Sequence, residues 1–161
     1  MANNFISGST NRLIYNLPVG DGDLSGQPVK VNYLLGTITQ DADSDDKAPV
    51  DMSSDVVYAH TVNNTKTYNQ GVAATFEHLE IGDVVYYDAS CIVVDPSFDG
   101  VETVRLTKSA LDSAGDFNCV FGKIVGLPAD YTEANTVQTI ARVWVLQDKA
   151  VSGCDENLFR E

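Results

Sequence analysis

The stretch TVQTIARVWVL, residues 136–146, contains the longest hydrophobic alternation of the chain. Within it, Val143 and Val145 fall on one face of an extended strand, and Arg142 and Trp144 fall on the other. Because successive side chains of a strand point to opposite faces, this spacing predicts a β-strand and not a helix. We therefore expect a strand here, with Val143 in the core.

Shorter runs rich in valine, threonine, isoleucine and tyrosine occur along the rest of the chain, separated by turn residues. β-Branched and aromatic side chains fit the half-buried surface of a sheet. The predicted strands are residues 12–17, 27–35, 37–39 after a bend at Gly36, 55–62, 83–88, 91–94, 101–107, 117–125 and 136–146. Many short strands with frequent turns predict an all-β fold, either a β-barrel or a β-sandwich.

The chain divides into a central domain and two ends. Residues 1–11 are expected to form an N-terminal arm, residues 12–147 the β domain and residues 148–161 a C-terminal tail. Residues 70–79 and 109–115 have compositions that allow short helical turns. The 161 residues suit one domain, so we expect a single-domain all-β fold with short helical turns and extended terminal arms.

The charge balance narrows the classes of partner. The chain has 10 Lys and Arg residues against 23 Asp and Glu residues, a formal net charge of −13 at pH 7. A field of this sign repels phosphate backbones and anionic membrane surfaces, so we expect neither nucleic acid nor membrane as a partner. The start of the chain lacks the basic and apolar regions of a secretory signal. The three cysteines form no C-x-x-C pair, and we expect two packed thiols and one thiol in the tail, in a reducing compartment.

Catalytic and metal-binding patterns are missing from the sequence. The histidines, His60 and His78, have no metal-ligand spacing, and the acidic loop at residues 41–46 lacks the glycine and glutamate of a calcium loop. We expect no catalytic residue, no cofactor and no metal, and hence a protein that is not an enzyme. An enzyme would require His60 or His78 beside a carboxylate or a thiol in a pocket.

Several segments carry a family resemblance through their order. They are residues 2–6, 25–29 with Leu35-Gly36, 56–58, 81–89, 121–126 and 141–145. The most telling is IGDVVYYDA, residues 81–89, where a Gly-Asp pair precedes an apolar and aromatic strand that ends in Asp. In this order the segments resemble a family of phage head decoration proteins, also called capsid cement proteins. The resemblance spans roughly residues 2–147, and this chain adds a longer insert at residues 63–79 and a tail.

The resemblance implies a virion structural protein that decorates the outer surface of a phage capsid after synthesis in the host cytoplasm. Such a protein bridges capsid subunits and stabilises the DNA-filled head, so its partner is the major capsid protein, and it is expected to sit there as a homotrimer. The family's N-terminal arm contacts the shell, which assigns capsid contact to Asn4, Phe5 and Ile6 of this chain. The negative net charge also suits an exterior coat that must not bind DNA.

An alternative interpretation is a carbohydrate- or protein-binding β-sandwich module of a tail or surface adhesin. Tyr68, Phe98 and Tyr131 fall in expected loops and, if exposed, would form a sugar platform. Either interpretation requires a packed core, for which we expect Tyr86 to lie opposite or near Val143.

Overall fold

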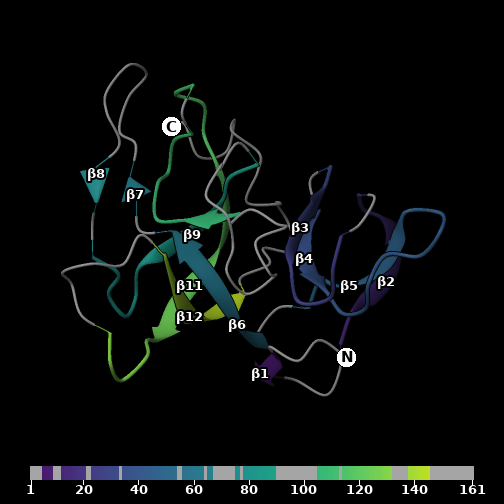
Figure 1. The fold of residues 1–161 in the computed structure, drawn as a ribbon, viewed down its shortest axis with the longest axis horizontal. Coiled ribbons are helices and arrows are strands. Elements are labelled where there is room, and N and C mark those ends of the chain that lie inside the picture. Colours follow the sequence, from purple (N-terminus) through teal and green to yellow (C-terminus); the bar gives the residue numbers. More distant parts are fainter. Residues whose placement is uncertain are drawn as a thin grey trace.

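The chain folds into β-sheets joined by loops (Figure 1). The structure, a computed structural model, describes residues 5–8, 12–20, 23–32, 34–53, 56–63, 65–66, 75–76, 78–89, 105–112, 114–131 and 138–145. These residues contain strands and turns and no helix, so the all-β prediction is confirmed and the predicted helical turns are not found in this part of the chain.

The larger sheet has six strands in the order β1-β6-β10-β9-β11-β12. They are β1 (Phe5–Ser7), β6 (Val56–Asn63), β9 (Val84–Tyr87), β10 (Leu106–Thr107), β11 (Cys119–Gly126) and β12 (Gln138–Val145). The strand expected at residues 136–146 is β12, and it also pairs with β6 along the whole length of that strand. Pairing therefore runs from β6 through β10, β9, β11 and β12 and returns to β6. The sheet is strongly curled, although the two-residue strand β10 leaves it short of a closed barrel.

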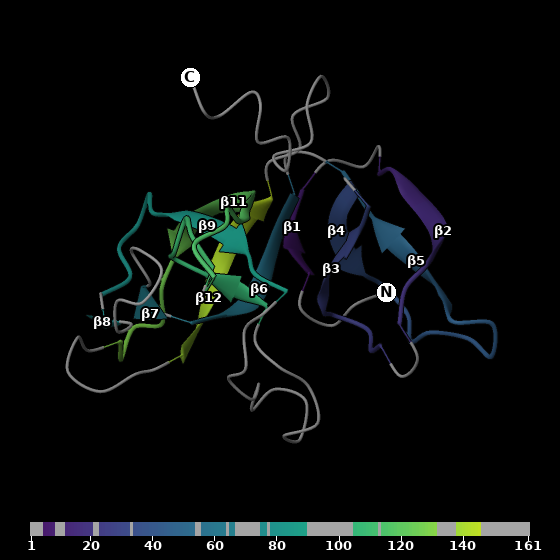
Figure 2. The same cartoon turned by 90° about the horizontal axis from the view of Figure 1, so that it is seen from above.

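A second sheet has four strands in the order β2-β5-β4-β3. They are β2 (Ile14–Pro18), β3 (Pro28–Val31), β4 (Leu34–Ile38) and β5 (Lys47–Asp51), and β7 (Thr65–Lys66) with β8 (Thr75–Phe76) forms a separate hairpin pair. The two main sheets lie side by side, and β1 lies between the rest of its own sheet and the four-stranded sheet (Figure 2). The arrangement brings β6 of the larger sheet against β4 and β5 of the smaller one.

The prediction of one continuous strand over residues 27–35 is wrong, because the chain turns back at Asn32. Val31 lies opposite Leu34, which leaves a two-residue loop between β3 and β4. Asn32 has a φ of 55°, in the left-handed region that asparagine tolerates and that tight hairpin turns require. The turn also separates two faces, since Val29 joins one apolar cluster and Leu35 joins another.

Gly36 does not bend the chain as predicted but lies inside β4, where it allows β5 to approach closely. A Cβ atom at this position would lie 2.5 Å from Val50 Cγ1 and 2.6 Å from the carbonyl oxygen of Asp51. Real Cβ atoms do not approach other atoms this closely, so glycine is required for packing.

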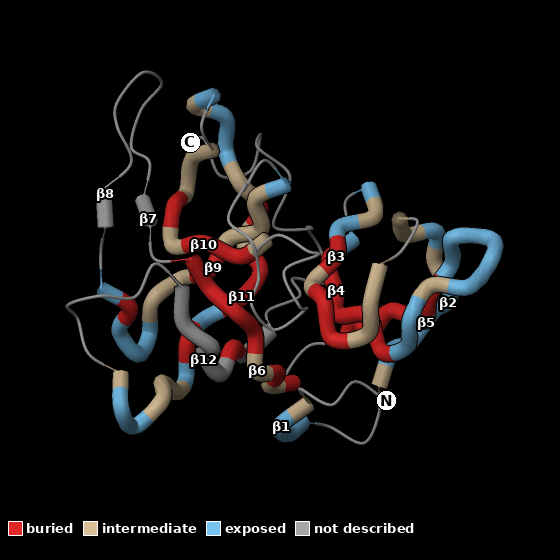
Figure 3. The backbone as a smooth tube through the Cα atoms, viewed as in Figure 1, coloured by how far each residue is buried: buried red, intermediate tan, exposed pale blue. Residues whose placement is uncertain are grey.

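The apolar residues form two clusters (Figure 3). The large cluster, which fills the six-stranded sheet and the gap to β4, contains Leu35, Val56, Tyr58, Val62, Leu79, Val85, Leu106, Cys119, Phe121, Ile124 and Val143. The small cluster lies on the other face of the four-stranded sheet and contains Val29, Ile38, Ala48, Val50 and Met52. Burial of Val143 agrees with the sequence pattern.

The predicted core position of Tyr86 is wrong by one residue. Val85 is fully buried in the large cluster, whereas Tyr86 is only partly buried. The strand partners of Tyr86 are Thr107 and Val120, not Val143. Because side chains alternate with a period of two, assigning the wrong member of a Val-Val-Tyr-Tyr run to the core reverses both faces.

Both segments predicted as helical turns contain strand or hairpin residues. Leu111 bridges Phe117, and the backbone N–H of Asp112 donates to the carbonyl oxygen of Asp116, so residues 109–115 belong to a tight hairpin loop. Within residues 70–79, Thr75 and Phe76 form β8, while 70–74 and 77 lie outside the described residues.

The expectation of free packed thiols does not hold for Cys119. This residue is buried in the large cluster and is disulfide-bonded, with the other sulfur outside the described residues. Its contribution to the core is therefore a covalent cross-link as well as apolar packing.

Candidate interaction surface

The predicted contact segment forms an edge strand on the larger sheet. Phe5 and Ser7 of β1 lie opposite Tyr58 and Val57 of β6. The Phe5 ring packs edge-on against the Tyr58 ring, with 5.4 Å between centroids, whereas Ile6 points outward and is 43% exposed. Asn4 lies outside the described residues. Phe5 thus anchors the strand, and Ile6 is available to a partner.

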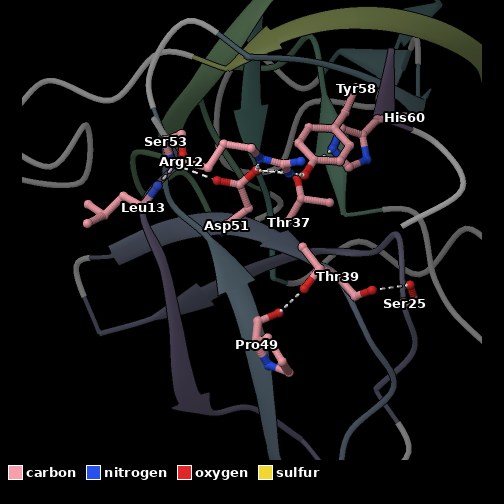
Figure 4. Close-up of polar contacts among 10 residues, drawn as sticks. All are labelled: Arg12, Leu13, Ser25, Thr37, Thr39, Pro49, Asp51, Ser53, Tyr58 and His60. Carbon is pink, nitrogen blue, oxygen red and sulfur yellow. Dashed lines mark hydrogen bonds and ion pairs between the residues drawn. The ribbon is translucent and has the colours of Figure 1, made fainter. Parts of the chain in front are cut away.

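A charged cluster of Arg12, Asp51 and Tyr58 links the two main sheets (Figure 4). The guanidinium of Arg12 lies over the Phe5 ring, 4.3 Å from its centroid, and pairs with the carboxylate of Asp51. Its Nε donates to Asp51 Oδ2 at 2.9 Å, and a terminal nitrogen donates to the hydroxyl oxygen of Tyr58. The Tyr58 hydroxyl in turn donates to Asp51 Oδ2 at 2.7 Å. The Arg12 side chain therefore links Asp51 of β5 to Tyr58 of β6 and contacts Phe5 of β1.

The loop after β5 completes the set of donors around Asp51. The backbone N–H of Ser53 donates to Asp51 Oδ1 at 3.0 Å, and the Ser53 hydroxyl oxygen accepts the N–H of Leu13 at 2.6 Å. This second bond fixes the start of β2 immediately after Arg12. The same network therefore positions both β1 and β2.

The network keeps Asp51 ionised although it is buried. Burial alone would raise the pKa of Asp51, but hydrogen bonds from Ser53, Tyr58 and Arg12 outweigh it and hold the pKa below its usual value. Burial, followed by the hydrogen bond to Asp51, raises the pKa of Tyr58, so the phenol stays protonated and remains a donor. The arrangement is a structural clamp whose ionisation states are stable near neutral pH.

A second polar contact joins the sheets at His60. Its Nε2 lies 3.0 Å from the Thr37 hydroxyl oxygen of β4, and its ring packs against Tyr58 and Phe121. Burial lowers the pKa of His60 to about 3. His60 therefore lies within the packed core, whereas His78 lies exposed on a loop.

Acidification is expected to destabilise the fold through His60. Its folded pKa lies below the unfolded value of about 6.5, so the unfolded chain binds the proton first. Stability is fully present above pH 6.5 and is lost at about 1.4 kcal/mol per pH unit as the pH falls toward 3. Urea denaturation at pH 7 and pH 5 should show a loss of about 2 kcal/mol from this group.

Matched variants isolate this effect from the general titration of carboxylates. His60→Gln should remove most of the loss between pH 7 and pH 5, while His78→Gln should retain it. If His60→Gln does not fold, NMR titration of the wild-type His60 ring should show no protonation at pH 5. A ring that titrates near pH 6.5 contradicts the placement of His60.

Three consecutive apolar residues, Leu13 just before β2 and Ile14 and Tyr15 within it, are exposed close to Arg12 in the sequence. Leu13 is 48% exposed, Ile14 42% and Tyr15 57%. Leu17 is the partly buried member of the strand and packs against the small cluster.

Of the aromatic residues proposed for a sugar platform, Tyr131 is the one that the structure describes. Tyr131 is partly buried against the large cluster, and its hydroxyl oxygen accepts the N–H of Leu79 at 2.8 Å. Tyr68 and Phe98 lie outside the described residues. Exposed aromatic side chains occur instead at Tyr15 and Phe117.

In the acidic loop, a carboxylate accepts hydrogen bonds from backbone N–H groups of the same loop. Asp43 Oδ1 accepts the N–H groups of Asp45 and Lys47, and Asp46 has a φ of 57°. Its carboxylates thereby shape the turn between β4 and β5. In the part of the chain that the structure describes, no three His, Cys, Asp or Glu side chains are arranged to hold a metal ion.

Sequence reasoning missed the clamp because its members are far apart in the chain. Arg12 and Asp51 are separated by 39 residues and Arg12 and Tyr58 by 46. A strand pattern assigns Tyr58 to a face, but it carries no information about which charge meets it from another sheet. The one available signal was the rarity of cations in a strongly acidic chain.

No protein-family model matches the chain, and neither a curated protein nor a solved structure shows significant similarity to it. No helix in the described residues is long and apolar enough to cross a membrane.

Proposed function

We propose that the protein is a non-enzymatic decoration protein on the outer surface of a phage capsid, where it binds the major capsid protein and stabilises the filled head. The observation that carries the proposal is β1, an N-terminal strand that is anchored by Phe5 and presents Ile6 to solvent. Such a strand can contact another protein without disturbing the core.

The resembling segments support the proposal by their positions in the fold. Residues 56–58 lie in β6, 121–126 in β11 and 141–145 in β12, while residues 81–89 contain the turn before β9 and β9 itself. These strands are neighbours in the six-stranded sheet. Residues 25–29 and Leu35-Gly36 instead lead into β3 and lie in β4 of the other sheet, so four of the resembling segments share one sheet.

Binding to many equivalent sites would stabilise a shell by mass action. A ligand that binds only the assembled state shifts the equilibrium toward that state, and repeated contacts add avidity. Three copies grouped at three-fold positions, as the resemblance implies, would place three apolar strands on neighbouring capsid subunits. The net charge of −13 would keep the exposed coat away from DNA and from other particles.

The decisive experiment measures binding to capsids of the phage that encodes the chain. Deletion of residues 1–11 should abolish binding while the circular dichroism spectrum remains that of a β protein. Ile6→Asp should weaken binding by at least about tenfold, because a charge replaces an exposed apolar contact. Ile81→Asp is the control, since Ile81 is 70% exposed in a turn elsewhere on the surface.

Counting by mass spectrometry provides an independent test. The copy number in purified particles should be a fixed simple fraction of that of the major capsid protein. Normal decoration by the truncated protein would refute the role of β1. Complete absence of the chain from particles would refute the proposed function itself.

A further inference from the structure

Among the residues that the structure describes, strand β2 is the outer edge of the four-stranded sheet. It pairs with β5, from Ile14 opposite Asp51 to Pro18 opposite Lys47, and begins the strand order β2-β5-β4-β3. At the opposite edge, the backbone of Lys30 in β3 hydrogen-bonds Tyr87 of the larger sheet. In Figure 2, β2 lies on the side of its sheet that faces away from the larger one. Exposed edge strands are templates for pairing with another chain.

The hydrogen bonds around β2 show which backbone groups face outward. The N–H of Met52 donates to the carbonyl oxygen of Leu13, and the N–H of Val19 donates to that of Asp46. In an antiparallel pair, the direction of these groups alternates from residue to residue. Leu13, Tyr15 and Leu17 therefore direct their backbone groups toward β5, while Ile14 and Asn16 direct theirs to the open edge. Pro18 has the outward orientation but no N–H.

The side chains of this edge are unusual for so acidic a chain. Residues 13–19 contain no Lys, Arg, His, Asp or Glu, although the whole chain carries a net charge of −13. Leu13, Ile14 and Tyr15 are each more than 40% exposed. Two copies of the chain repel each other because both carry a net negative charge. At this edge they can approach without bringing like charges together.

We propose that β2 is a self-association site, at which two copies of this chain pair their β2 strands antiparallel about a two-fold axis through Tyr15. In this register Ile14 of each copy faces Asn16 of the other, and each pair exchanges both backbone hydrogen bonds. Leu13 faces Leu17 of the second copy. Every outward N–H and C=O of Ile14 and Asn16 is then paired.

Neighbouring two-fold registers are less favourable. Centring on Asn16 places Ile14 opposite Pro18, which lacks the donor that the pair requires. Centring on Ile14 places Asn16 opposite Arg12, which precedes β2, so this pair falls outside the strand. The sequence of β2 thus selects the register centred on Tyr15.

Packing favours the same register. Tyr15 lies opposite Val50, and Leu17 lies opposite Ala48, so both share the face of the small apolar cluster. Tyr15 of the two copies forms a non-hydrogen-bonded pair, the closer type of cross-strand contact. The small cluster of one copy would continue through the two tyrosines into that of the other. Such a two-fold contact is separate from the three-fold grouping and would link neighbouring groups.

Cysteine cross-linking tests the register directly. Tyr15→Cys should give a covalent dimer under mild oxidation, because residues of a non-hydrogen-bonded pair have Cα atoms about 4.5 Å apart, within disulfide range. Asn16→Cys is the matched control, since its two copies would be offset along the strands beyond about 7 Å. Peptide mass spectrometry distinguishes the new link from those of the native cysteines. Equal cross-linking of both variants overturns the register.

Sedimentation of paired charge variants tests the association itself. Wild type should sediment as a dimer, and Tyr15→Lys and Tyr15→Glu should each weaken dimerisation by at least about tenfold. An equimolar mixture of the two should restore a dimer. Asn16→Pro should also dissociate the dimer while circular dichroism shows that the monomer keeps its fold, because it removes an outward donor only. A monomeric wild type, or a dimer that these variants leave intact, overturns the proposal while leaving capsid binding untouched.

Discussion

Val85→Asp is expected to prevent stable folding, whereas Tyr86→Asp at the next position should still fold. Val85 is fully buried in the large cluster, so an aspartate there would place an unpaired charge in the core. The expected loss in the free energy of unfolding exceeds about 4 kcal/mol, which is a large part of the 5–15 kcal/mol that typically stabilises a domain. Tyr86 is partly buried, so its replacement should cost about 1–2 kcal/mol.

Soluble expression, circular dichroism and urea denaturation distinguish the two variants. Val85→Asp should be aggregated or unfolded in the absence of denaturant. Tyr86→Asp should unfold cooperatively, at a lower urea concentration than the wild type. If Tyr86→Asp lost more stability than Val85→Asp, Tyr86 would lie in the core. That result would contradict the register of β9 against β10 and β11. Val85→Ala serves as an intermediate case, since it leaves a cavity without a charge.

Arg12→Met is expected to lower the free energy of unfolding by about 3–5 kcal/mol, because it strands a buried carboxylate. The side chain of Asp51 is 0% exposed and that of Arg12 is 11% exposed, so water cannot replace the lost partner. Lys108→Met is the control. Its ion pair with Asp83, at 2.9 Å, lies nearer solvent, where pairs contribute about 1 kcal/mol or less.

A double variant separates the value of the ion pair from the cost of breaking it. Arg12→Met with Asp51→Leu should recover part of the loss, because neither charge is then buried without a partner. Urea denaturation at pH 7 measures all these variants. A loss below 1 kcal/mol in Arg12→Met would mean that the clamp does not join the sheets. Truncation of β1 should also be less harmful than Arg12→Met, since loss of Phe5 removes ring contacts with Tyr58 and Arg12 but leaves no buried charge without its partner.

Local patterns predicted five of the twelve described strands with nearly matching bounds, β2, β6, β9, β11 and β12, but no pattern indicated β1, β5, β7 or β8. The alternations at residues 55–62 and 136–146 correspond to β6 and β12, the longest antiparallel pair of the larger sheet. The apolar run at residues 117–125 corresponds to β11, with a register irregularity between Val120 and Gly122 where the run is interrupted. These predictions succeed because a half-buried strand needs alternating side chains whatever its partners are.

Two local features were misread because partner strands decide them. The alternation over residues 27–35 continues through a two-residue turn, so one strand and a hairpin have the same pattern until Asn32 adopts a positive φ. Gly36 was read as a bend, yet its role is to admit Val50 and Asp51 of β5. Neither role is visible without the neighbouring strand.

The sequence by itself determined that the chain is an acidic, all-β protein with Val143 on a buried face. Charge, composition and the period-two pattern are local quantities, and the fold must respect them. The tertiary structure alone decided that Arg12 and Asp51 meet at Tyr58, that Phe5 anchors β1 and that β2 becomes an open edge. These features depend on which strands pair and which sheets face each other. Contacts between residues about 40 positions apart leave no periodic trace in the sequence.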